Sequence, residues 1–297
     1  MLRFRPVYAA VLLSCSLHAA VFPADSYVSA IEQDRAKSNM MMRGPEGPFA
    51  FVARLHPKPG ISSLGRDPAN DLVLPVEKAP AHVGKIDWQG ERAVLRLEPG
   101  VTAVVDGKQV TSIEVSSSPA HLKIGEMTLN LSFRDSKLVV SVNDADALKG
   151  KKMNPAAWFP VNPAYRITAD WVPFAEPKTI RIPDTDGGSR MWKVPGYASF
   201  VIDGKKLTLQ SVLSPDGKDM TFFFRDRTAG HETYGAGRFL DADLPKNGKV
   251  ILDFNQAYNP SCAFNHLYIC PIPPEENHLS IRIPAGALKY VFAEQVQ

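Results

Sequence analysis

The chain has 297 residues, 44% of them hydrophobic, so it is long enough for two domains with packed cores. Its formal net charge of +3 gives no electrostatic footprint of nucleic-acid binding, which would need Lys and Arg clustered on one face. The 25 prolines, about 8% of the residues against ~5% on average, favour turns and strand edges over long helices. Beyond the N-terminus no apolar run approaches the ~20 residues of a membrane-spanning helix, so we predict no transmembrane segment in the mature chain.

Residues 1–24 have the pattern of a signal peptide. Two arginines precede an apolar run at 7–13, and small residues follow it. The letters LLSC, ending at Cys15, resemble the bacterial lipoprotein signal, in which this cysteine becomes lipidated. Ordinary cleavage near Ala19 or Ala20 is the alternative. We therefore expect export to the periplasm or cell envelope, with or without a lipid anchor.

A short helix is expected over residues 25–45, with Asp25 or Ser26 as its N-cap and RGPEGP at its end. From Phe49 onward the hydrophobic pattern has a period of two. The stretch EMTLNLSFR (126–134) alternates apolar and polar residues without error, and turn signals such as WQGE and VDGK separate such runs. Residues 46–142 are therefore predicted to form a β sandwich.

Polar and proline residues interrupt the strand pattern at 143–163, which we interpret as a linker. Strand-like runs resume over residues 164–297. The letters VIDGKKL predict a hairpin with an Asp-Gly turn at Asp203 and Gly204. The expected fold class is all-β: two tandem β domains, a sandwich and then a sandwich or barrel, preceded by the signal peptide and the helix.

The segment ISSLGRDPANDLVLPVEKAPAHVGKI, followed by VVDGKQV, resembles the forkhead-associated domain, an eleven-stranded β sandwich that binds phosphothreonine. Arg66, Asn70 and His82 match the family's pattern, but Ala79 replaces a serine and Asp106 replaces an asparagine. Alanine removes a hydroxyl donor, and aspartate brings negative charge toward a phosphate dianion. We predict a sandwich that keeps the frame and has lost phosphopeptide binding, with Arg66 and His82 fixing loops.

Cys262 and Cys270 are the cysteines expected in the mature chain, and their proximity in an exported protein predicts a disulfide. Two reduced core cysteines are the alternative. The C-x7-C spacing is not that of zinc ligands, so no metal and no cofactor are predicted.

The C-terminal half resembles domain-of-unknown-function family 1684. The runs that carry the resemblance are R-D-x-T-x-G (225–230), T-Y-G-A-G-R (233–238), L-D-F-N-x-A-Y-N-P (252–260) and C-P-x-P-P-x-E-N (270–277). The upstream FPVNPAYRITADW and the N-terminal sandwich fit the same family, so the resemblance extends over nearly the whole mature chain. It implies fold and kinship and assigns no activity.

Charged and hydrogen-bonding residues on rigid loops at one end of a β domain are typical of a pocket for a small polar ligand. In VILDFN, period two places Val250, Leu252 and Phe254 on the core face and Asp253 and Asn255 on the other. The candidate ligand-binding residues are Arg225, Asp226, Thr228, Tyr234, Arg238, Asp253, Asn255, Tyr258, Asn259, Glu276 and Asn277.

Familiar catalytic motifs are absent from the sequence. HETYG lacks the second histidine of H-E-x-x-H, GAGRFL lacks the third glycine of a dinucleotide fingerprint, and there is no G-x-S-x-G. Asp226 paired with Asp253 or Glu276 is the remaining acid/base candidate.

Three functions stay open: a binding protein for a small polar ligand, an envelope structural or interaction protein whose polar cluster is internal bracing, and a hydrolase using acidic residues. Catalysis is left undecided. His231 and His266 are expected to be exposed loop residues.

Overall fold

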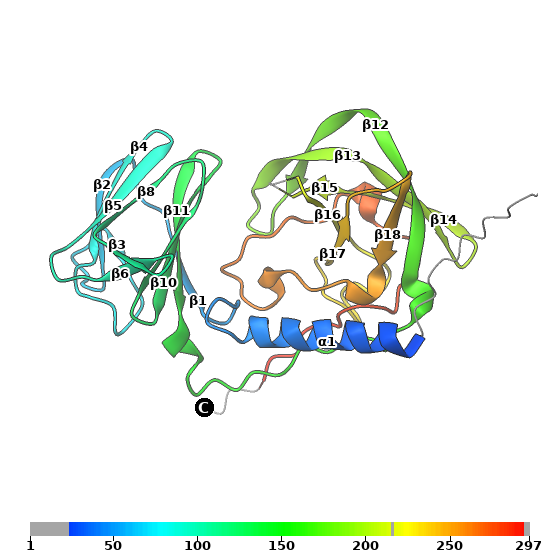
Figure 1. The fold of residues 1–297 in the computed structure, drawn as a ribbon, viewed down its shortest axis with the longest axis horizontal. Helices are drawn as coiled ribbons and strands as arrows, with labels where there is room; N and C mark the ends of the chain where they lie inside the picture. The colour runs from blue at the N-terminus through cyan, green and yellow to red at the C-terminus, as the bar shows by residue number, and fades with distance from the viewer. Residues whose placement is uncertain (1–23, 215–216, 294–297) are drawn as a thin grey trace, which may run out of the picture.

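The computed structural model describes residues 24–214 and 217–293, so the predicted signal peptide and Cys15 lie outside the described residues. Two β units lie side by side, and helix α1 (Ala24–Met42) runs along the second unit toward the first (Figure 1). The prediction of a mostly β fold preceded by one short helix is confirmed. In the described part of the chain, no helix combines the length and the apolar character that crossing a bilayer demands.

The first unit is a sandwich of two sheets that share one apolar core. Its six-stranded sheet has the order β1 (Phe51–Leu55), β11 (Lys137–Asp144), β10 (Met127–Arg134), β9 (Ala120–Ile124), β6 (Ala103–Val105) and β7 (Lys108–Val110). Its five-stranded sheet has the order β3 (Leu72–Val73), β2 (Gly60–Gly65), β4 (Gly84–Gln89), β5 (Arg92–Leu97) and β8 (Ser112–Val115). All pairs are antiparallel except β2–β3.

Strand β10 shows why this sequence forms a sandwich. Met127, Leu129 and Leu131 are buried on one face, and the intervening polar residues are half-buried on the other. Because successive side chains of a strand point to opposite faces, this alternation gives one core face and one outer face.

The second unit combines a four-stranded and a three-stranded antiparallel sheet. The four-stranded sheet has the order β14 (Lys205–Gln210), β13 (Ser189–Ile202), β12 (Arg166–Pro183) and β18 (Lys249–Asp253). The three-stranded sheet has the order β15 (Val212–Leu213), β16 (Asp219–Phe224) and β17 (Arg238–Asp243). The predicted hairpin joins β13 to β14, where Asp203 (φ 50°) and Gly204 (φ 72°) have the positive φ values of a type I′ turn.

After β18 the chain follows an irregular path across the second unit. This C-terminal segment carries several of the signature residues and contains short 3-10 helices rather than strands. The 3-10 helices of the described chain are η1 (Ala145–Leu148), η2 (Pro163–Tyr165), η3 (Phe254–Gln256), η4 (Ser261–Ala263) and η5 (Glu275–Asn277).

The two units touch through the C-terminal segment and through a buried carboxylate. Asp184 of the second unit pairs with Arg190 (2.6 Å) and with Arg134 of β10 (3.0 Å). The Arg54 guanidinium of β1 donates to the Leu267 carbonyl, and the Asn265 amide donates to the Phe51 carbonyl. Specific contacts therefore join the two units.

The residues of the forkhead-associated pattern serve loop structure. The Arg66 guanidinium donates to the Ala79 carbonyl (3.2 Å), and the Asn70 amide donates to the Ala81 carbonyl (2.9 Å). The ring of His82 lies 3.3 Å from the Asn70 side-chain oxygen, and Asp106 occupies the positive-φ turn between β6 and β7. The loop-fixing contacts expected for Arg66 and His82 are present, while the likeness to that family stays a prediction.

Candidate functional site

Asp226 and Arg238 form a buried ion pair, with 3.2 Å between the Arg238 Nη2 and Asp226 Oδ1 atoms and both side chains 1% exposed. Asp226 also accepts hydrogen bonds from the Thr228 hydroxyl (2.7 Å) and the Ile283 amide (2.6 Å). The Arg238 guanidinium donates further to the carbonyls of Ile283 and Ala285. Burial lowers the pKa of Arg238, and Asp226 opposes that shift. The pair therefore ties the loop after β16 to the C-terminal segment.

Asn277 braces the same unit from another direction. Its side-chain amide exchanges hydrogen bonds with the backbone of Gln210 in both directions and also donates to the Phe223 carbonyl. Arg225 is half-buried next to it, and Glu276 is exposed. An asparagine held in this way completes the edges of β14 and β16 and has no hydrogen-bonding capacity directed at a ligand.

Asp253 and Asn255 hold helix α1 against the second unit. The Tyr27 hydroxyl lies 2.8 Å from each Asp253 carboxylate oxygen. The Asn255 amide donates to the Asn162 carbonyl, and the Arg35 guanidinium donates to the Asn255 carbonyl (both 2.9 Å). Burial and the neighbouring Asp253 raise the pKa of Tyr27 above its usual range. Both residues are buried and contact the helix, Asp253 through Tyr27 and Asn255 through Arg35.

Cys262 and Cys270 are free thiols 2.9 Å apart, so the predicted disulfide is not formed in this structure. A disulfide requires ~2.05 Å between the sulfur atoms. The hydrogen bond with Cys270 lowers the pKa of Cys262, while the same contact raises that of Cys270. The Tyr234 hydroxyl lies 3.5 Å from the Cys262 carbonyl.

The predicted ligand-binding residues therefore do not surround one hollow. Asp226, Thr228 and Arg238 form one network, Asp253 and Asn255 a second, and Asn277 a third, each satisfied by protein groups. The hydrolase candidates Asp226, Asp253 and Glu276 are likewise separated between these networks and the surface. Among the described residues, no group of His, Cys, Asp and Glu has an arrangement suited to a metal ion.

A cavity of about 550 Å³ lies between the C-terminal end of α1 and the second unit. We call it the helix cavity. Apolar groups dominate its walls, and Tyr258 and Asn259 are the predicted residues in them. Its lining residues are Ser38, Met41, Met42, Gly44, Pro45, Glu46, Gly47, Pro48, Ala156, Trp158, Tyr258, Asn259, Ser261, Phe264 and Ala287.

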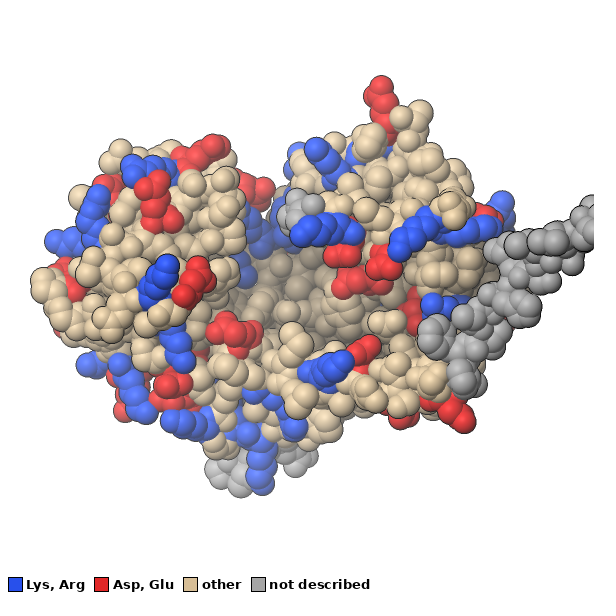
Figure 2. Space-filling model, in the orientation of Figure 1, with Lys and Arg blue, Asp and Glu red and all other residues tan. Residues whose placement is uncertain are grey.

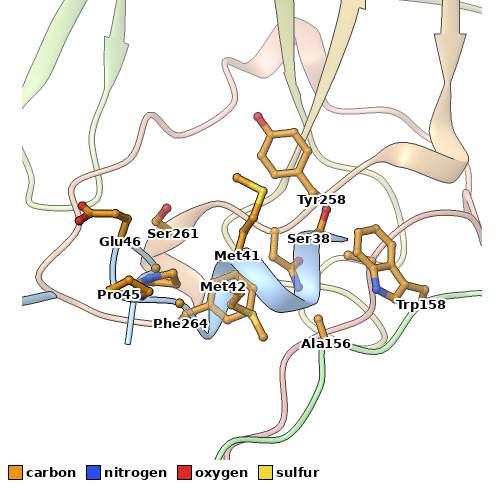
Figure 3. Close-up of a pocket in the computed structure, with 15 residues that line it drawn as sticks. Ser38, Met41, Met42, Pro45, Glu46, Ala156, Trp158, Tyr258, Ser261 and Phe264 are labelled. Atoms are coloured by element: carbon orange, nitrogen blue, oxygen red, sulfur yellow. The ribbon is translucent and has the colours of Figure 1, made fainter. Parts of the chain in front are cut away.

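The close-up in Figure 3 shows how the helix cavity is walled. The Met41 side chain rises between Glu46 and Tyr258, and the indole ring of Trp158 closes one side.

Figure 2 shows a hollow with an uncharged floor between the two units, with acidic side chains on either side of it. Tyr258 donates to the Asp241 carboxylate (3.0 Å), and burial raises the pKa of Tyr258 well above its usual range.

A smaller space of about 320 Å³ continues along α1 from the helix cavity. It shares Ser38, Trp158 and Tyr258 with that cavity and adds Asp34 and Asp241. Arg35 lies in its wall, but its guanidinium donates to the carbonyls of Phe159 and Asn255. The two spaces form one region beside the helix.

Comparison with known proteins finds similarity in the second unit and assigns no activity. Residues 151–288 match the model of DUF1684, a family described as protein of unknown function. This match supports the signature in the second unit and leaves the N-terminal sandwich outside it, so the predicted extension over the whole mature chain is not supported. An uncharacterized protein of Haloarcula marismortui, solved by NMR, is 28% identical, covering 46% of this chain and 76% of that chain, with a TM-score of 0.39. No curated protein matches the chain.

The contribution of α1 was missed by the sequence analysis. Tyr27, Ile31, Arg35, Ser38 and Met42 are spaced three or four residues apart and so lie on one face of a helix. This face docks on the second unit and lines the cavity, but it mixes polar and apolar residues. A search for purely hydrophobic periodicity does not detect such a face.

Proposed function

We propose that this protein binds a small, mainly apolar molecule in the helix cavity. The observation that carries the proposal is the cavity itself: about 550 Å³ with predominantly apolar walls and hydroxyl groups of Ser38, Ser261 and Tyr258 among them. Small-molecule sites are typically clefts of about 300–1,000 Å³ with a few polar groups on apolar walls. The expected polar ligand is thereby revised to an apolar body with a small polar group.

The charges around the helix cavity favour a neutral or positively charged ligand. Glu46 accepts a hydrogen bond from the Thr128 hydroxyl, and Asp241 accepts from the Thr221 and Tyr258 hydroxyls. These hydrogen bonds come from uncharged groups and do not neutralise the two carboxylates. The guanidinium of Arg35 is directed at backbone carbonyls. The Arg35 guanidinium lies over the Trp158 ring, 5.0 Å from its centroid, so the ring of Phe264 is the one proposed to attract a ligand cation through its face.

Binding rather than catalysis is proposed because the buried ionisable groups are used elsewhere. Asp226 and Arg238 neutralise one another, and Asp253 accepts from Tyr27. A general acid or base needs an ionisable group within hydrogen-bond reach of a reacting atom. These side chains instead hold the C-terminal segment and helix α1 against the second unit.

We further propose that the protein is exported to the cell envelope, because residues 1–24 have the sequence pattern of a signal peptide. An envelope interaction protein without a ligand is the second candidate. It is favoured by the bracing networks, which account for most of the predicted site residues.

The neutral fluorescent dye N-phenyl-1-naphthylamine tests the proposal. Ser38→Trp fills the helix cavity from an exposed position on α1, and Ala36→Trp adds the same ring to an exposed position that does not line it. We expect Ser38→Trp to weaken dye binding at least about tenfold and Ala36→Trp to leave it unchanged. Equal binding by both variants would favour the interaction protein.

A further inference from the structure

A second and larger cavity, of about 1,230 Å³, lies on the other side of Phe264, which lines both spaces. It is formed where the start of the first unit, the linker after η1 and the C-terminal segment meet. We call it the lysine pocket, after Lys149, Lys151 and Lys152 in its wall.

The charge of the lysine pocket is opposite to that of the helix cavity. His266 accompanies the three lysines, and its described lining residues include no Asp or Glu. Lys149 is paired with Asp146 (2.6 Å), which lies outside the lining. Lys151 and Lys152 are exposed and belong to the same wall, so they leave a net positive charge.

Aromatic side chains form much of the remaining wall of the lysine pocket. The ring of Tyr290 lies 5.0 Å from that of Phe264 and 5.0 Å from that of Phe292, measured between ring centroids. Phe49 packs on the same tyrosine at 5.6 Å. Phe292 is 59% exposed, which is unusual for a large apolar side chain held in an aromatic cluster. A planar apolar group entering the pocket would cover this ring.

We propose that the lysine pocket binds a small organic anion that carries an aromatic group. Its ammonium groups provide charge-assisted hydrogen bonds to a sulfonate, carboxylate or phosphate. The adjoining rings provide the stacking surface for the aromatic part. This inference does not depend on the helix cavity, because apart from the shared Phe264 it involves other residues, a ligand of opposite charge and separate variants.

The test uses 8-anilinonaphthalene-1-sulfonate, an aromatic sulfonate, with the full chain, residues 294–297 included. The double variant Lys151→Glu/Lys152→Glu reverses the charge of the pocket. The matched control Lys205→Glu/Lys206→Glu makes the same change on the exposed β14 hairpin. We expect the first variant to weaken binding at least about tenfold and to abolish its salt dependence, with the control close to wild type.

Two further measurements keep the proposal falsifiable. Phe292→Ala, at an exposed position, is expected to lower the affinity for the aromatic sulfonate and leave the unfolding transition unchanged. The sequence continues after Ala293 with Glu294, so a variant lacking residues 294–297 tests whether the chain's own end competes. Unchanged or tighter binding by this variant supports the proposal. Loss of binding on that deletion, or equal binding by the two lysine variants, would overturn it.

Discussion

The Tyr27 hydroxyl lies 2.8 Å from both carboxylate oxygens of Asp253, although 226 residues separate the two in sequence. This contact fixes the N-terminal end of α1 on the second unit. Because the other end of the same helix forms a wall of the helix cavity, the stability of the helix dock and the shape of the cavity are connected.

Tyr27→Phe is therefore expected to loosen α1 without unfolding the protein. It removes a hydrogen bond to a buried carboxylate, a change that typically costs about 1–3 kcal/mol. Hydrogen exchange of the α1 amides and the free energy of unfolding in urea measure the effect. Ser29→Ala, on an exposed position of the same helix, serves as the control. Unchanged exchange in Tyr27→Phe would contradict the docking role.

The same pair gives a pH dependence with a definite sign. Burial and Asp253 raise the pKa of Tyr27 in the folded protein, whereas the unfolded chain loses this proton near pH ~10. The stabilisation by Tyr27 is therefore present below pH ~10 and declines as the pH rises above it. The difference in unfolding free energy between wild type and Tyr27→Phe should shrink from about pH 8 to about pH 11. A constant or growing difference would count against the pair.

Breaking the buried Asp226–Arg238 pair is expected to destabilise the second unit strongly. Asp226→Ala leaves the buried Arg238 guanidinium without its partner, and Arg238→Ala leaves the buried Asp226 carboxylate without its partner. Either loss typically costs about 3–5 kcal/mol. The double variant Asp226→Ala/Arg238→Met should lose much less than the sum of the single changes. Urea unfolding measures these free energies. Arg282→Ala, which breaks the exposed pair with Glu232, should change stability far less. Near-neutral single variants would restore these residues as ligand-binding candidates.

The backbone at Gly237 accepts no side chain. Its φ is +106°, and an added Cβ would lie 2.7 Å from the Phe224 carbonyl oxygen. Gly237→Ala is expected to cost on the order of 1–3 kcal/mol. Gly235→Ala offers a close control, because there the nearest atom to an added Cβ is 3.6 Å away. Equal melting temperatures of the two variants would show that the turn is not constrained as described.

The free thiols of Cys262 and Cys270 are close enough to be joined by oxidation. In an oxidising buffer we expect a disulfide that removes two hydrogens and stabilises the fold by roughly 2.5 kcal/mol, because the closed loop has about nine residues. Mass spectrometry of the peptides that contain these cysteines detects the bond, and Cys270→Ala controls for the stability gain. Two alkylatable thiols after oxidant treatment would refute this prediction.

Much of the fold was predictable because it depends on local patterns. The strict alternation of β10 and the Asp203–Gly204 turn specify strands and a hairpin without knowledge of distant residues. The linker and the irregular C-terminal segment are less regular in pattern, and their paths depend on contacts between units, such as that of Arg134 with Asp184.

The site was harder to predict, because residue types do not give the distances between side chains in the folded protein. The charged residues of the signature indicated a polar network, and the structure contains such networks, but their partners are other protein groups. Tyr27 lies far from Asp253 in sequence, and nothing near Asp253 identifies it as a partner. The helix cavity depends on the same long-range docking, so the sequence alone gave no indication of it.

The most direct measurement of the central claim uses the indole N–H signal of Trp158. This side chain lines the helix cavity, and its nitrogen has no hydrogen-bond partner among the described residues. In ¹H–¹⁵N spectra, with the signal assigned by Trp158→Phe, titration with N-phenyl-1-naphthylamine should shift this resonance and the amides of Ser38 and Phe264 together. Dye binding that leaves these signals in place and shifts others would contradict the account.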